Sequence, residues 1–211
     1  MRAVAAPFER PRDRDDELRA VATVRFLDLP PRRCVMIDGE GLPGEAAFAP
    51  RMPGLYGTAW TLRFRLKARG NVTRVGPLEG LWWTAGGSTS LDAVFGPGRE
   101  AGRETWHWTL LIALPDEATE TELVGALATG RSKLDAALAE GLRVETFAEG
   151  RVAQLLHVGP YATERPTIER LHAAISEAGL RPRGHHHELY LGDPRRSAPD
   201  RLKTILRQPV A

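Results

Sequence analysis

The order of predicted strands and helices occurs twice along the chain, and this duplication limits the fold more than any other feature. In the first copy the apolar runs ATVRFLDL and RRCVMIDGEG, divided by Pro30-Pro31, suit two strands. A helix at about 46–64 follows, with an irregular or delayed start indicated by Pro50 and Pro53, and then the strands LEGLWWT and TWHWTLLIALP. The second copy gives GLRVETF, RVAQLLHVG, a helix in TERPTIERLHAAISEAG, HHELYLGD and LKTILRQPV. Each copy therefore reads strand, strand, helix, strand, strand.

A further helix is predicted between the copies, in TETELVGALATGRSKLDAALAEG, with Gly130 as a blemish that costs about 1 kcal/mol relative to Ala. We expect repeat one at about 21–115, the linking helix at about 118–141 and repeat two at about 142–211. The first twenty residues mix Pro with dense charge. They are expected to form a solvated leader, 1–20, that ends in a helical turn or a loose arm.

Two such repeats favour one domain over two, because each small sheet is marginal alone and each helix needs a sheet to cover. The predicted fold is α+β: duplicated strand–helix–strand–strand modules form one concave antiparallel sheet with helices packed on one face, in pseudo-two-fold symmetry over 21–211. The seam between the halves is a natural place for a ligand cleft.

Composition excludes several classes of protein. The 211 residues carry a net charge of +2, and basic side chains are interleaved with acids, which argues against a nucleic-acid surface. No apolar run reaches the roughly 18 residues of a membrane span, and no signal peptide is visible. Cys34 is the single cysteine, which fits a reducing compartment. We expect a cytoplasmic protein with no nucleic-acid or membrane partner and with protein partners unknown.

The segment HHHELYLGD places one carboxylate, Glu188, among apolar neighbours. Side chains alternate along a strand, so Glu188 shares a face with His186 and Tyr190. A lone buried acid is costly without partners, so Glu188 is either a rim residue or the polar anchor of a ligand site. Glu79 occupies the same point of repeat one, on a face with Trp83, where the alternative is a hairpin residue near a loop.

Four tryptophans fall on two adjacent predicted strands: Trp82, Trp83, Trp106 and Trp108. Some are expected to fill the core, but rings in this number also suit a flat apolar ligand. A carboxylate behind them would favour a cationic ligand through cation–π contact.

The segment HVGPYATERPT joins a strand to the helix of repeat two. Gly159-Pro160 makes the turn, Tyr161 follows, and Glu164 falls at the start of the helix. An acid there complements the helix dipole, which is one explanation. A functional role at the mouth of the predicted seam is the other.

The triple histidine 185–187 invites a metal site, but adjacent strand residues point in opposite directions and no third ligand is in register. We expect no metal and no cofactor. Of the residues in HHHELYLGD, the histidines are the least expected to take part in ligand binding or catalysis. No phosphate-binding loop or nucleophile elbow is present, and nothing suggests a nucleophilic Cys34.

These motifs resemble the GyrI-like small-molecule-binding family. The matching segments are LPPRRCVMIDGEG, LYGTAWTLRFRLK, PLEGLWW, TWHWTLLIALP, HVGPY with Glu164, HHELYLGD and LKTILRQPV. They run in order over nearly the whole chain after the leader, most like the stand-alone branch. The family's duplicated module and concave sheet agree with the fold inferred from the repeat.

The resemblance implies a central pocket for aromatic, often cationic, lipophilic compounds, with Glu188 at the position of the family's buried drug-sensing glutamate. Some stand-alone members resemble hydrolases that open cyclopropane rings of DNA-alkylating natural products, and Glu188 and Glu164 match their pair of glutamates. Trp60 departs from the Tyr of many relatives. The expected ligand-binding residues are Glu188, Tyr190, Tyr161, Trp83, Trp108, Tyr56 and Glu79.

Three functions remain open and are ranked in this order. The first is binding of planar aromatic molecules for sequestration or resistance. The second is hydrolysis with Glu188 and Glu164 as acid and base, in an order that the sequence leaves open. The third is regulation of another protein through the surface.

Overall fold

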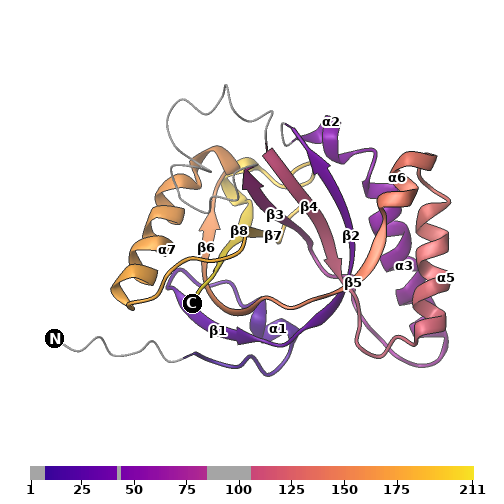
Figure 1. Cartoon of the computed structure of the whole chain (residues 1–211), viewed down its shortest axis with the longest axis horizontal. Helices are drawn as coiled ribbons and strands as arrows, with labels where there is room; N and C mark the ends of the chain where they lie inside the picture. Colours follow the sequence, from indigo (N-terminus) through magenta and orange to yellow (C-terminus); the bar gives the residue numbers. More distant parts are fainter. Residues whose placement is uncertain (1–7, 42–43, 85–105) are drawn as a thin grey trace. The chain divides into compact units, whose positions relative to one another are not determined.

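The computed structural model describes residues 8–41, 44–84 and 106–211, and Figure 1 shows their helices and strands. Residues 1–7 of the expected leader, residues 42–43 and residues 85–105 lie outside the described residues. The described strands follow the twofold order predicted from the sequence. They are β1 Arg25–Leu29, β2 Arg32–Glu40, β3 Leu78–Thr84, β4 Trp106–Ala113, β5 Arg143–Phe147, β6 Gly150–Val158, β7 His186–Tyr190 and β8 Lys203–Pro209.

The helices complete an α+β fold with antiparallel strands, which confirms the predicted fold class. Short 3₁₀ turns, η2 Tyr161–Thr163 and η3 Pro199–Arg201, precede α7 and β8 respectively. The α-helices are α1 Arg14–Glu17, α2 Glu45–Phe48, α3 Met52–Ala68, α5 Glu120–Arg131, α6 Ala136–Gly141 and α7 Arg165–Glu177.

Two predicted helices differ in extent from those of the structure, although the irregular start indicated by Pro50 and Pro53 is confirmed. The helix expected at about 46–64 is two helices, α2 and α3, and α3 continues to Ala68. Proline has no amide N–H to donate within a helix but suits a first turn. Pro50 accordingly lies in the turn between α2 and α3, and Pro53 lies in the first turn of α3. The linking helix expected over 118–141 is also divided, into α5 and α6, because the Asp135 side chain accepts a hydrogen bond from the Leu138 amide and starts a new helix.

The chain divides into two compact units that do not coincide with the two repeats. The α7 unit comprises Met1–Pro30, Leu81–Glu100 and Ala148–Ala211, and the α3 unit comprises Pro31–Gly80 and Ala101–Phe147. In the α7 unit β1, from repeat one, pairs with β6 of repeat two. In the α3 unit β5, from repeat two, pairs with β2 of repeat one. The first strand of each repeat therefore pairs with a strand of the other repeat, in the unit that contains most of that other repeat.

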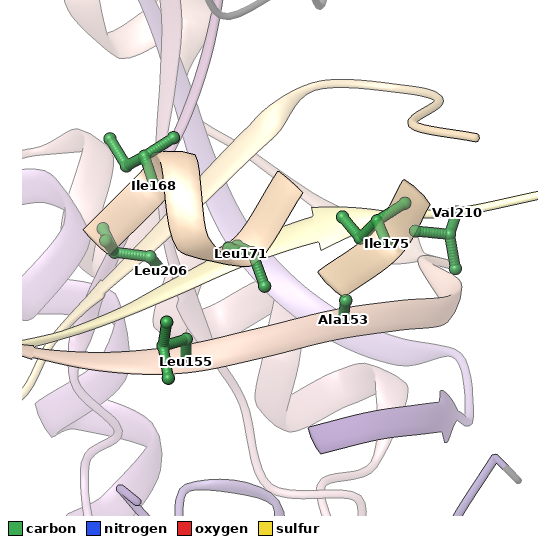
Figure 2. Close-up of a cluster of buried hydrophobic side chains, with 7 residues drawn as sticks. All are labelled: Ala153, Leu155, Ile168, Leu171, Ile175, Leu206 and Val210. Atoms are coloured by element: carbon green, nitrogen blue, oxygen red, sulfur yellow. The ribbon is translucent and has the colours of Figure 1, made fainter. Parts of the chain in front are cut away.

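In the α7 unit the strands lie in the order β1-β6-β8-β7, and α7 covers one face. Figure 2 shows the buried cluster between them, to which α7 contributes Ile168, Leu171 and Ile175 at helical spacing. Burying each such side chain contributes about 1.5–3 kcal/mol. Ala153 and Leu155 of β6 and Leu206 of β8 mark this as the α7 face of the sheet; Val210 completes the cluster.

The ends of α7 match the sequence signals. Pro166 lies in its first turn, as predicted. Gly179 follows its carboxyl end with φ of 72°, in the left-handed region that glycine adopts without strain. These signals fix where α7 starts, and hence where Glu164 lies.

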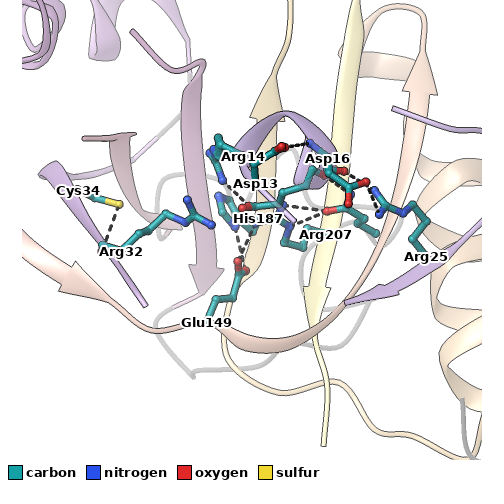
Figure 3. Close-up of polar contacts among 11 residues, drawn as sticks. Asp13, Arg14, Asp16, Arg25, Arg32, Cys34, Glu149, His187 and Arg207 are labelled. Carbon is teal, nitrogen blue, oxygen red and sulfur yellow. Dashed lines mark hydrogen bonds and ion pairs between the residues drawn. The ribbon is translucent and has the colours of Figure 1, made fainter. Parts of the chain in front are cut away.

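The opposite face of the α7 unit holds a buried ionic cluster around Arg207, shown in part in Figure 3. The guanidinium, 1% exposed, donates to Glu17 at 3.0 Å and to Glu149 at 2.9 Å. Glu149 also contacts His187 Nδ1 at 2.9 Å. Burial alone would raise the pKa of Glu149, but the charges and hydrogen bonds of His187 and Arg207 outweigh it and lower the pKa to about 2.

The ionic cluster corrects the expectation that the leader is wholly solvated. The expected helical turn is present as α1, but its last residue, Glu17, is 1% exposed. Besides Arg207, the Glu17 carbonyl accepts a hydrogen bond from Gln154 at 2.8 Å. A charge-rich segment therefore supplies part of the buried structure.

In the α3 unit the strands lie in the order β4-β2-β5, and α3 lies between β2 and α5 (Figure 1). Gly130 of α5 allows the two helices to approach, because a Cβ there would meet Thr58 Oγ1 at 2.0 Å and the Gly54 carbonyl at 2.6 Å. The residue that looked like a blemish in a linking helix is therefore a packing requirement. Among the described residues, no helix combines the length and apolarity needed to cross a bilayer.

Arg207→Met is expected to lower the free energy of unfolding by about 3–5 kcal/mol, because it leaves two buried carboxylates without their cation. The matched control is Arg195→Met, since Arg195 pairs with Asp193 at an exposed site and such a pair contributes about 0–1 kcal/mol. Denaturant unfolding measures both. An equal loss of stability in the two variants would contradict a special role for the buried cluster.

Candidate functional site

Four predicted site residues lie at the amino-terminal end of α7, all within the α7 unit. Glu188 and Tyr190 come from β7, Tyr161 from η2, and Glu164 stands directly before α7. We call these four residues the carboxylate site. Glu188 lies opposite Leu206 in the antiparallel pair of β7 and β8. Directly opposed side chains share a face, so Glu188 points to the α7 face, where Leu206 packs.

The turn that carries Tyr161 and Glu164 is held by local contacts. Gly159 has φ of 135°, and a Cβ there would lie 3.2 Å from Thr163 Oγ1, so the turn requires glycine. The buried His157 lies at the end of β6, with Nε2 3.3 Å from the Pro160 carbonyl and Nδ1 3.0 Å from Thr167 Oγ1. These contacts connect β6 to both sides of Glu164 and fix its backbone.

Glu188 is 8% exposed, so it is not a rim residue. The Tyr190 hydroxyl donates a 2.8 Å hydrogen bond to Oε2 of Glu188. On the same strand face, His186 Nε2 lies 3.4 Å from Oε1. The alternation of β7 thus gives the carboxylate one neighbour on each side, and a donated hydrogen bond stabilises its charged form.

Glu164 is 4% exposed, and its Oε1 is buried without a hydrogen-bond partner. Burial first, and then the charge of Glu188, raise the pKa of Glu164 to about 9, while the Thr204 hydroxyl lowers it slightly. Glu164 is therefore protonated at neutral pH. Its side chain makes no capping hydrogen bond to α7 either. A neutral carboxyl gains little from the helix dipole, so that explanation of an acid at this position does not account for Glu164.

The two tyrosines form an aromatic wall beside the carboxylates. Their rings meet edge to face, with centroids 5.7 Å apart. Burial and then the negative charge of Glu188 raise the pKa of Tyr190 well above its ordinary value. Burial, followed by Glu164, Glu188 and Asp193, raises the pKa of Tyr161 to about 12. Both phenols therefore remain neutral donors, and Tyr161, 41% exposed, forms the accessible part of the site.

The arrangement combines Glu164, a carboxyl group with a raised pKa, with Glu188, a second carboxyl group near enough to contribute to that shift. The first can donate a proton, and the second can accept one or hold a cation. Unlike environments for two carboxyl groups are the usual means of dividing acid and base roles at neutral pH.

The remaining predicted ligand-binding residues are not brought into the carboxylate site by these contacts. Trp83 stacks on His185, with ring centroids 4.3 Å apart. In the α3 unit Trp108 is fully buried against Phe48, and Tyr56 is half-buried on α3. Glu79, also in that unit, is 1% exposed. Their roles in ligand binding stay predictions, as does the cleft at the seam.

Strand alternation puts His186 on the face of Glu188, although the sequence indicates a functional role for none of the three histidines. The structure separates the three histidines: His185 stacks on Trp83, His187 joins the ionic cluster, and His186 contacts the Glu188 carboxylate. Strand alternation was the signal that could have singled out His186. Within the described residues, no group of three or more His, Cys, Asp or Glu side chains is placed to hold a metal ion.

Comparison with known proteins agrees with this architecture. The sequence model of the GyrI-like small molecule binding domain matches residues 112–210. An uncharacterized conserved protein from Listeria innocua is 30% identical, with TM-score 0.77, over 94% of this chain and 97% of its own. A search of curated proteins found no match.

Two further solved structures have the same fold. A hydrolase from Listeria innocua is 28% identical with TM-score 0.73, over 93% of this chain and 96% of that one. The EcmrR C-terminal domain is 11% identical with TM-score 0.55, over 90% of this chain and 97% of its own, a likeness that concerns the fold alone.

Glu164→Gln is expected to remove a pH dependence of stability. The Glu164 pKa is 4.5 ordinarily and about 9 in the folded protein. Its stabilising contribution is therefore complete below pH 4.5 and is lost as the pH rises toward 9, by on the order of a few kcal/mol. The stability of Glu164→Gln relative to wild type should grow over that interval in denaturant unfolding.

The exposed Glu169, also on α7, supplies the control Glu169→Gln, whose difference from wild type should change little with pH. In ¹³C NMR titration, Glu188→Gln should lower the Glu164 pKa yet leave it above 4.5, because burial remains. A Glu164 carboxyl that titrates near 4.5 in the wild type would contradict the proposed protonation.

Proposed function

The chain belongs to the GyrI-like family of small-molecule-binding domains, and from that premise we propose that it hydrolyses an aromatic small molecule at the carboxylate site. One observation carries the proposal: two buried carboxyl groups of one unit have unlike surroundings. Oε1 of Glu164 has no hydrogen-bond partner and burial raises the pKa of Glu164 to about 9, whereas Glu188 accepts a hydrogen bond from Tyr190. A site that only binds a cation needs one of them. A relative of 28% identity whose structure is described as a hydrolase adds support.

The proposed substrate class is a flat compound in which a cyclopropane ring is fused to a dienone. Glu188 accepts a proton from water, whose oxygen bonds to a ring carbon as a ring C–C bond breaks. The electron pair moves to the dienone oxygen, which becomes a phenol by taking the proton of Glu164. A proton returned from Glu188 to Glu164 restores the pair. The reaction adds one water molecule, and each proton-transfer role contributes about 10²–10⁴-fold.

The test is to incubate the protein with a cyclopropane-bearing alkylator in ¹⁸O-labelled water and to follow the products by mass spectrometry. Wild type should yield the ring-opened product with one labelled oxygen. Glu164→Gln and Glu188→Gln should each reduce kcat by about 10²–10⁴-fold, whereas the exposed Glu169→Gln should match wild type. Unchanged substrate after exposure to wild type would reject hydrolysis of this class.

A second candidate function is reversible binding of cationic aromatic compounds. The observation that favours it is the single negative charge of Glu188 beside two tyrosine rings, since an anion and ring faces together suit an organic cation. In this function Glu164 would remain a neutral hydrogen-bond donor. The protein would remove a toxic compound by holding it.

Fluorescence titration with a cationic dye and a neutral dye of similar shape separates charge recognition by Glu188 from binding that does not depend on charge. Glu188→Gln should weaken the cationic dye by about tenfold or more, which corresponds to about 1.4 kcal/mol, and change the neutral dye little. Glu169→Gln again serves as the control. An equal loss for both dyes would remove Glu188 from charge recognition.

A further inference from the structure

The carboxylate of Glu188 is contacted at both oxygens by side chains of its own strand. Tyr190 donates to Oε2 at 2.8 Å, and His186 Nε2 lies 3.4 Å from Oε1. The three residues follow one another at i, i+2 and i+4 on one strand face. The Tyr190 contact is a formed hydrogen bond, whereas the His186 contact is longer.

The backbone under His186 is fixed from the other face. Its neighbour His187 lies opposite Arg207 in the pair of β7 and β8, and both side chains belong to the buried ionic cluster. His186 itself is 3% exposed. Buried ion pairs therefore hold the stretch of backbone from which the His186 imidazole projects, and the imidazole itself is enclosed.

On the α7 side, His186 lies near a second histidine, His172. Burial, and then the charge of His186, lower the pKa of His172 to about 4, so His172 is neutral at neutral pH. A neutral neighbour does not compete with Glu188 as a charged partner.

We propose that His186 is a positioning residue that holds Oε1 of Glu188 in the orientation needed to accept the proton of water. The inference rests on the proposed hydrolysis and assigns this histidine a task within it. The terminal torsion of a glutamate is broad and two-fold, so one hydrogen bond from Tyr190 leaves the second oxygen free to swing. A donor on the other side removes that freedom. Contacts of this kind are often long without substrate and shorten when it binds.

The alternative is that His186 only fills space in the core, and two substitutions separate the possibilities. His186→Gln keeps an N–H donor near the position of Nε2, while His186→Leu keeps volume and removes the donor. If the donor matters, His186→Leu should lower kcat by about 10–100-fold with KM nearly unchanged, as for a misplaced catalytic group, and His186→Gln should stay close to wild type. If only packing matters, both should fall together with thermal stability.

The experiment measures kcat and KM on the cyclopropane-bearing alkylator, with thermal melting, for wild type, both His186 variants and the control His107→Gln, a half-buried histidine of the α3 unit. In parallel, ¹³C NMR relaxation of the Glu188 carboxyl carbon reports its order without any turnover. We expect a more mobile carboxyl in His186→Leu and an ordered one in His186→Gln.

The outcomes distinguish the two proposals. A wild type that does not turn over the alkylator, with a carboxyl loosened only in His186→Leu, rejects the hydrolysis and supports the positioning. A His186→Leu variant with wild-type kcat, or with a Glu188 carboxyl as ordered as in wild type, overturns the positioning role.

Discussion

A buried carboxylate must find a cation, hydrogen-bond donors or a proton, and the α7 unit meets this constraint differently on the two faces of one sheet. On one face, Arg207 and His187 keep Glu149 charged. On the α7 face, Glu164 keeps a proton instead. The first solution holds structure together, because it fixes strands and α1 to one another. The second leaves a group whose protonation chemistry can change.

The two solutions depend on each other through β7. Successive residues of this strand, His187 and Glu188, belong to opposite faces, so the ionic cluster that fixes one fixes the backbone of the other. An acid–base pair needs its groups held within a fraction of an ångström. The ion pairs on the face of Arg207 therefore hold rigid the strand that carries Glu188 on the α7 face, where fewer charged groups are buried.

Much of the α7 unit could be predicted from the sequence because its signals are local. The alternation of HHHELYLGD placed Glu188 with Tyr190, and the turn signals placed Tyr161 before Glu164. What the sequence missed depends on contacts between distant residues. The burial of Glu17 needs Arg207, and the need for Gly130 comes from α3. The raised pKa of Glu164 comes from burial and from Glu188, on a strand more than twenty residues away. One miss was local: Asp135 divides the linking helix that the apolar pattern had joined.

The exchange of first strands has a consequence for how such a chain can be divided or can have arisen. A polypeptide ending between the repeats would lack β6 for its β1 and β5 for its β2, and each fragment would expose unpaired strand edges. A single-repeat ancestor could complete its sheet by trading that strand with a second copy, as in domain swapping. In the duplicated chain this strand exchange occurs within one molecule. The topology therefore favours complementation between two separately expressed halves over independent folding of either half.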